Sequence, residues 1–160
     1  MEERSARNVG LEHFDKRVRQ IIHECLNKEI TLLELDVNER SITHKIAEHL
    51  QEYFREIRYD VDCEYNRDGH DKKTLQLEPR SVLNDNSEGD TVFPDIIVHV
   101  RGTRTNLVVI EAKKNTNRDK TDVEKLQAFK EQLGYKLCYR LIINVGKDLN
   151  HERLYELTRA

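Results

Sequence analysis

Residues 91–114 read TVFPDIIVHV (91–100), RGTRT (101–105) and NLVVIEAKK (106–114), and this stretch decides the fold. Its first and last runs are rich in Val, Ile and Leu at both odd and even positions, which is typical of β-strands covered on both faces. The five polar residues between the two runs have the length of a hairpin loop. The stretch therefore predicts two adjacent antiparallel strands in the middle of a sheet.

Charged residues interrupt both predicted strands. Asp95 lies near the start of the first strand, and Glu111 and Lys113 lie at the end of the second, on one face because side chains alternate along a strand. If the hairpin places Val100 opposite Asn106, Asp95 lies opposite Glu111, with Cβ atoms about 5 Å apart. Two buried carboxylates at that separation repel, so we expect a cation between them, and a divalent metal ion is the simplest one. In the alternative interpretation these residues are ordinary exposed charges at solvent-facing strand ends.

Two short motifs carry a resemblance to a known family. Pro94-Asp95 and Glu111-Ala112-Lys113, with fifteen residues between the two acids, resemble the P-D…(D/E)-x-K signature of the PD-(D/E)xK, or restriction-endonuclease-like, nuclease superfamily. The resemblance implies that Asp95, Glu111 and Lys113 are catalytic. It also implies that Mg²⁺, for which Mn²⁺ can substitute, is bound by Asp95, Glu111 and the backbone carbonyl of Ala112.

A further acid is found in the preceding helix. Asn38 is a plausible N-cap for a helix over residues 39–54, and Ile42, Ile46, Leu50 and Phe54 would form its buried stripe. Glu39 lies seven residues before Ile46, so it projects along the same face. Members of the superfamily often carry a metal-binding Glu on this helix, and Glu39 resembles it. The alternative is a first-turn acid favoured by the helix dipole.

The remaining elements complete an α/β pattern. The resemblance implies a restriction-endonuclease-like αβββαβ core at about residues 39–145, with a mixed four-stranded sheet flanked by helices, inside a single domain that covers residues 1–160. Residues 1–38 would form an N-terminal helical extension. Periodicity and capping signals predict these further elements: a helix over 11–28, a strand over 57–67, a long loop over 68–90, a helix opened by a T-x-x-E capping box at Thr121 and ended by Gly134, a strand over 135–145, and a helix over 151–159.

Three further side chains are secondary candidates. Glu64 could face the site from the strand over 57–67. More commonly, a polar residue at such a position lies on the face of the strand that is exposed to solvent. Lys125 and Gln127 lie near the start of the helix over 121–134, and some superfamily members use a Lys or Gln from this helix. A solvated helix face is the alternative for both.

Composition limits the partners. With a formal net charge of -3, the chain is not a uniformly basic nucleic-acid binder, so any phosphate contacts must be local. A basic cluster close to the carboxylates in the sequence offers such contacts: Arg101, Arg104, Lys114, Arg118 and Lys120. Without the neighbouring carboxylates, a solvated charged loop would be the better interpretation of this cluster. The sequence has no apolar run of membrane-spanning length and no apolar signal region, which argues against a membrane partner. Three widely spaced cysteines do not suggest a disulfide framework, so we expect a reducing cytoplasm.

The sequence therefore leads to two functional hypotheses. The first is a Mg²⁺-dependent nuclease that hydrolyses phosphodiester bonds, with DNA as the favoured substrate. Its oligomeric state stays open, and a homodimer is one alternative. The second is a catalytically inactive module of the same fold that binds nucleic acid or protein partners, since the superfamily also contains such members. The intact set of Asp95, Glu111 and Lys113 favours the first hypothesis.

Overall fold

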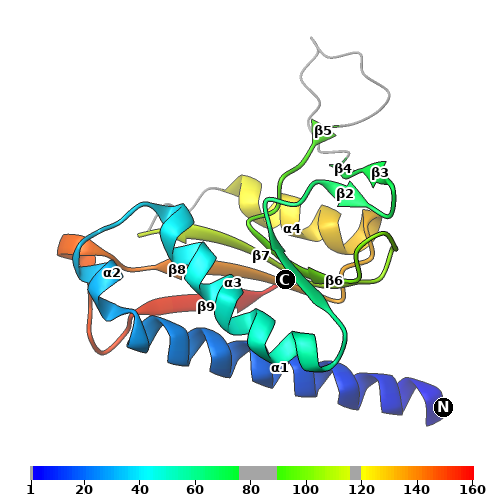
Figure 1. Ribbon diagram of the computed structural model, residues 1–160, viewed down its shortest axis with the longest axis horizontal. Coiled ribbons are helices and arrows are strands. Elements are labelled where there is room, and N and C mark those ends of the chain that lie inside the picture. Colours follow the sequence, from blue (N-terminus) through cyan, green and yellow to red (C-terminus); the bar gives the residue numbers. More distant parts are fainter. Residues whose placement is uncertain (1, 76–89, 116–119) are drawn as a thin grey trace.

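The computed structural model describes residues 2–75, 90–115 and 120–160 (Figure 1). A mixed sheet forms its centre, with the strand order β1-β6-β7-β8-β9. The elements follow one another as α1 (Glu2–Lys28), α2 (Ile30–Glu34), α3 (Glu39–Glu56), β1 (Asp60–Cys63), β2 (Arg67–Asp68), β3 (Asp71–Lys72), β4 (Thr74–Leu75), β5 (Asp90–Thr91), β6 (Ile96–His99), β7 (Asn106–Lys114), α4 (Lys120–Gln132), β8 (Leu137–Ile143), the 3-10 turn η1 (Gly146–Asp148) and β9 (Tyr155–Arg159).

Strand pairing confirms the α/β class with a mixed sheet flanked by helices. Neighbouring strands are antiparallel except β7 and β8, which run parallel, as expected for a strand that returns through the helix α4. The sheet has five strands instead of the predicted four. The fifth is β9, where the sequence had predicted a helix over residues 151–159.

That helix prediction was wrong because residues 155–159 also fit a two-residue period. Leu157 pairs with Leu141 of β8, and Tyr155 and Leu157 pack as half-buried residues against the main core. The backbone N–H and C=O groups of residues 155–159 bond to β8 and so add a strand to the edge of the sheet. This pairing outweighs the weak helical spacing of the leucines. The rest of the segment predicted as a helix forms a turn.

The β6–β7 hairpin has the register that matters for the site. Ile96 pairs with Ile110 and Ile97 with Val109, so one further step places Asp95 opposite Glu111, as predicted. An irregularity after Val98 shifts the far end of the hairpin, where His99, and not Val100, pairs with Asn106. The carboxylate register is unaffected because the shift lies on the loop side of Val98.

Helices cover both faces of the sheet. Figure 1 shows α1 and α3 together on one side and α4 on the other. The predicted stripe of α3 is fully buried in the larger core, where each such side chain stabilises the fold by about 1.5–3 kcal/mol: Ile42, Ile46, Leu50 and Phe54. A second, smaller core lies under α4 and includes Val109, Leu126 and Phe129. The candidate site lies at the end of β6 and β7 that is opposite the hairpin loop.

Several boundaries differ from the predictions. Helix α1 begins at Glu2 instead of residue 11, and α4 spans Lys120–Gln132, so Thr121 lies within the helix. The strand predicted over 57–67 is limited to Asp60–Cys63. The loop predicted over 68–90 contains parts of two small antiparallel ladders, and its residues 76–89 lie outside the described structure. None of the described helices has the length and apolarity needed to cross a membrane.

Candidate metal and active site

Asp95 and Glu111 meet at one end of the β6–β7 pair. Asp95 immediately precedes β6, and its Oδ2 accepts a hydrogen bond of 2.8 Å from the backbone N–H of Ala112. Glu111 lies within β7 and is only 3% exposed, and its Oε2 accepts from Lys125 Nζ at 3.1 Å. The hairpin register therefore brings two carboxylates from neighbouring strands to one place, and each has a different donor.

The backbone of Ala112 is also directed toward this place. In an antiparallel ladder the N–H and C=O of one residue point to the same side of the strand, so the Ala112 carbonyl points to the side on which its N–H meets Asp95. Pro94 precedes β6 without belonging to it, and its carbonyl accepts a hydrogen bond of 2.9 Å from the Glu64 N–H on the β1 side. Proline has no N–H of its own to donate to the Ala112 carbonyl, an oxygen that a metal ion could use.

Burial makes these acids hold their protons more tightly than usual. Loss of hydration, followed by the charge of Asp95, raises the pKa of Glu111 to about 8, although Lys125 acts in the opposite direction. Burial also raises the pKa of Asp95, against the lowering effect of the hydrogen bond from Ala112. Both shifts mean that the folded protein carries its negative charge here at an energetic cost that a nearby cation would relieve.

Glu39 lies within electrostatic range of the same place. It occupies the first turn of α3, which Asn38 caps by accepting a hydrogen bond from the Ser41 N–H at 2.8 Å. Its pKa is raised by burial first and by Asp95 next, whereas Lys113 lowers it. The structure thus brings Glu39 near Asp95, as the ligand interpretation of its position requires.

Lys113 lies beside the carboxylates without being paired. It is half-buried near the end of β7, and its side chain makes no hydrogen bond or ion pair with another residue in the described ranges. Its positive charge nevertheless lowers the pKa of both Asp95 and Glu39. An ammonium group in this position can contact an anion brought to the site.

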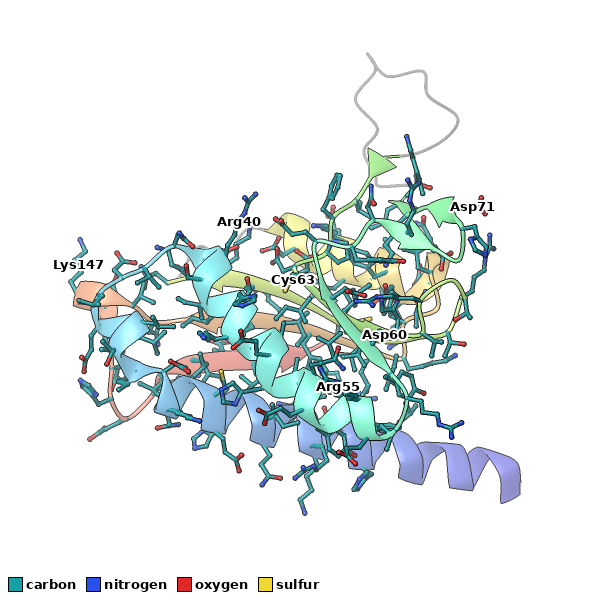
Figure 2. The ribbon with its side chains drawn as sticks, in the orientation of Figure 1. Arg40, Arg55, Asp60, Cys63, Asp71 and Lys147 are labelled. Atoms are coloured by element: carbon teal, nitrogen blue, oxygen red, sulfur yellow. The ribbon has the colours of Figure 1, made fainter. Side chains whose placement is uncertain are left out.

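A cleft of about 420 Å³ opens at Asp95 between α3 and the end of β1. Figure 2 labels Arg40 and Cys63, which lie on the two sides of this cleft. Glu64, which directly follows β1, also lines it and forms an ion pair of 3.4 Å with Arg40. The secondary candidate Glu64 is therefore near the site, although its side chain is about half exposed.

Helix α4 contributes one predicted residue and one that was missed. Lys125 reaches Glu111, whereas Gln127 is exposed and donates to Glu131 on its own helix at 2.6 Å. Asp122, one turn before Lys125, is only 7% exposed. Its spacing from Leu126 and Phe129 (i, i+4, i+7) marks the inward face of α4, and this signal was available in the sequence. Val123, the next residue along the helix, is 51% exposed and lies outside this inward face.

The carboxylate oxygens of Asp95 and Glu111 are not directed toward a common position in the structure. Within residues 2–75, 90–115 and 120–160, no three or more His, Cys, Asp or Glu side chains are grouped so that they could hold a metal ion. Asp95 is turned toward Ala112 N–H and Glu111 toward Lys125. Glu111 Oε1 is nevertheless buried without a hydrogen-bond partner in the described structure. Hard carboxylate and carbonyl oxygens are the donors that Mg²⁺ and Mn²⁺ prefer, so the residues fit such an ion once Lys125 releases Glu111.

The predicted basic cluster does not surround the site. Arg101 and Arg104 lie in the hairpin loop at the opposite end of β6 and β7, about 20 Å from Asp95 at the usual rise of a strand. Arg101 Nε donates to Asp62 at 2.9 Å, and Arg104 Nη2 donates to Asp71 at 2.9 Å. Figure 2 shows Asp71 at the β2–β3 hairpin, well apart from Arg40 at the cleft.

The other basic candidates differ in position. Lys114 is nearer the site but donates to Asp36 at 2.8 Å and to the Val37 carbonyl at 3.2 Å. Arg118 and the side chain of Lys120 lie outside the described part of the structure. Among the described residues, Lys113 and Lys125 act directly on the two carboxylates, and Arg40 lies beside Asp95 in the cleft.

Comparison with known proteins adds no assignment. A scan of protein-family models, a search of curated proteins and a search of solved structures each found no match to this chain. Its function is therefore inferred from the chemistry of its own residues.

Proposed function

We propose that this chain is a metal-dependent nuclease with a restriction-endonuclease-like core, which hydrolyses phosphodiester bonds and has DNA as its favoured substrate. One observation carries the proposal. Asp95 and Glu111 lie opposite each other at the end of β6 and β7, and Lys113 shares the face of Glu111 two residues farther along. Carboxylates and a lysine in this relation suit a site that binds a divalent cation and a phosphate together.

The residues that would hold the ion are Asp95, Glu111 and the carbonyl of Ala112, with Glu39 reaching in from α3. A bound divalent ion supplies Lewis acidity, which lowers the pKa of a water molecule and neutralises charge on the scissile phosphate. The raised pKa values of Glu39, Asp95 and Glu111 support this ligand set, because each shift reports a carboxylate whose charge is poorly compensated in the ion-free state.

Lys113 would act on the phosphate. Its ammonium group is unpaired among the described residues and already interacts electrostatically with Asp95. In that position it can donate hydrogen bonds to a non-bridging phosphate oxygen and stabilise the negative charge that grows there during hydrolysis. Lys113 therefore contributes to the transition state more than to substrate binding, which predicts a loss of rate with little loss of affinity.

The test is cleavage of single-stranded DNA, duplex DNA and RNA in the presence of Mn²⁺ or of a chelator. We expect cleavage only with the metal ion, and its loss in Asp95→Asn and in Lys113→Ala. Lys136→Ala is the matched control, because Lys136 is exposed and its backbone N–H bonds to the Leu107 carbonyl near the loop end of β7, away from the carboxylates. Circular dichroism checks that each variant is folded.

The outcomes separate the two functional hypotheses. Undiminished cleavage in Asp95→Asn or Lys113→Ala would refute the assigned roles. Binding of nucleic acid without cleavage under any metal condition would instead favour the catalytically inactive module.

A further inference from the structure

Asp122 is a buried acid with an unsatisfied oxygen. It lies in the first turn of α4 and is 7% exposed, and its Oδ2 has no hydrogen-bond partner in the described structure. Helix dipoles favour an acid in this turn, but that effect operates equally well for an exposed side chain. Burying a carboxylate oxygen without a partner costs stability, so the position of Asp122 requires another explanation.

Asp122 and Glu111 belong to one group of charges. Lys125 follows Asp122 by three residues, a spacing that places their Cβ atoms about 5–6 Å apart on the helix surface. Lys125 Nζ in turn lies 3.1 Å from Glu111 Oε2, while the second oxygen of Glu111, Oε1, is buried and unpartnered. The negative charge of Asp122 also raises the pKa values of Glu111 and Glu39. Each of the two carboxylates therefore has a buried oxygen without a partner, and Lys125 bonds only to Glu111 Oε2.

The sheet does not supply the missing cation. Arg140 of β8 pairs in register with Glu111, and residues in register on parallel strands point to the same face. Its Nε and Nη2 atoms are, however, buried without a hydrogen-bond partner, so Arg140 does not satisfy Glu111 Oε1. Lys125 remains the one described cation that contacts Glu111, and it occupies only one of the carboxylate oxygens.

We propose that Asp122 is a metal ligand of this site and that, together with Glu111, it binds a divalent cation in exchange for the ammonium group of Lys125. This inference rests on the proposed function, because it adds a ligand from α4 to the same metal site. In the ion-free protein Lys125 holds Glu111, and binding of the cation releases Lys125. The released side chain is 25% exposed at the start and can turn toward a phosphate of the substrate.

The proposal is tested by calorimetric titration of Mn²⁺ into the full chain without nucleic acid. We expect Asp122→Asn and Asp122→Ser to weaken Mn²⁺ binding by about tenfold or more, since each removes a charged ligand but retains an acceptor for the helix start. Glu124→Gln is the matched control, because Glu124 is an exposed acid on the same turn of α4 and should leave the affinity unchanged. The thermal unfolding midpoint of each ion-free variant is measured in parallel.

Each result has a distinct meaning. Weaker Mn²⁺ binding in both Asp122 variants, with ion-free midpoints equal to or above that of the wild type, supports the inference. Wild-type affinity in the Asp122 variants overturns it and leaves the proposed function standing. A wild-type protein that binds no Mn²⁺ at millimolar concentration overturns both the inference and the proposed function.

Discussion

Lys125 Nζ lies 3.1 Å from Glu111 Oε2, and this ion pair joins α4 to β7 across the end of the sheet. The carboxylate is almost fully buried, while the ammonium group keeps partial access to water. Such an arrangement lets the lysine serve as a counter-ion that can leave, whereas the acid is fixed by the strand. In the proposed metal site, Lys125 would therefore occupy part of the cation position when no ion is bound.

Replacing Lys125 with Met should separate metal binding from catalysis. Without the competing ammonium group, Mn²⁺ should bind about tenfold more tightly, whereas cleavage should slow because Lys125 can no longer contact the phosphate. Titration calorimetry and a cleavage assay measure the two effects. Lys130→Met, an exposed change near the end of the same helix, is the control. Weaker Mn²⁺ binding in Lys125→Met would show that the lysine does not compete with the ion.

Replacing Glu111 with Gln should stabilise the ion-free fold at pH 8. The pKa of Glu111 rises from 4.5 to about 8 on folding, so between these values the folded state holds a proton that the unfolded state has lost. The contribution of Glu111 to stability therefore falls as pH rises from about 4.5 to 8. We expect Glu111→Gln to be more stable than the wild type by roughly 2–4 kcal/mol at pH 8 and nearly equal at pH 4. Urea denaturation at both pH values measures the difference, and a less stable variant at pH 8 would contradict it.

The central hairpin was predictable because local signals and tertiary environment agree there. Apolar residues at both parities predicted strands buried on both faces, and the short loop fixed the approach of Asp95 to Glu111. The helix α3 followed from the Asn38 cap and a clean apolar stripe. Each of these features depends on residues close together in the sequence, so no knowledge of distant contacts was needed.

Part of what was missed depends on distant contacts. The residues of β9 fit both a strand period and a weak helical spacing, and the edge of β8 available for pairing decides in favour of the strand. Asp122 was overlooked for a different reason: an acid in a first helical turn has an ordinary explanation, although the i, i+4, i+7 spacing with Leu126 and Phe129 marks the buried face of α4. The arginines of the hairpin loop are close to Glu111 in sequence but lie at the other end of an extended strand.

Removing the N-cap of α3 should affect both stability and metal binding. Asn38 Oδ1 accepts hydrogen bonds from the Ser41 N–H at 2.8 Å and the Ser41 hydroxyl at 2.9 Å, and Glu39 is the next residue. We expect Asn38→Ala to cost about 1 kcal/mol of unfolding free energy and to fray the turn that positions Glu39. Mn²⁺ affinity should fall, while Asn38→Asp, which keeps the cap, should preserve both properties. Unchanged Mn²⁺ affinity in a destabilised Asn38→Ala protein would argue that Glu39 is only a first-turn acid.

Lys73 allows a pH prediction that is independent of the metal site. Its side chain is completely buried, and its ammonium group donates a hydrogen bond to the Tyr135 hydroxyl. Burial lowers the pKa of Lys73 from 10.5 to about 8, with Asp68 and Asp62 acting in the opposite direction. Between pH 8 and 10.5 the unfolded state therefore binds the proton that the folded state has released, so the contribution of Lys73 to stability rises with pH.

Lys73→Met should consequently be more stable than the wild type at pH 7, by roughly 1–3 kcal/mol after loss of the Tyr135 hydrogen bond is included. This advantage should shrink as pH rises from 8 to 10.5. Comparing the two proteins at each pH cancels the titration of the cysteine thiols, whose pKa values are also raised by burial. Lys72→Met is the control, because the neighbouring Lys72 is exposed. An advantage of Lys73→Met that stays constant with pH would show that Lys73 does not lose its proton in the folded protein over this range.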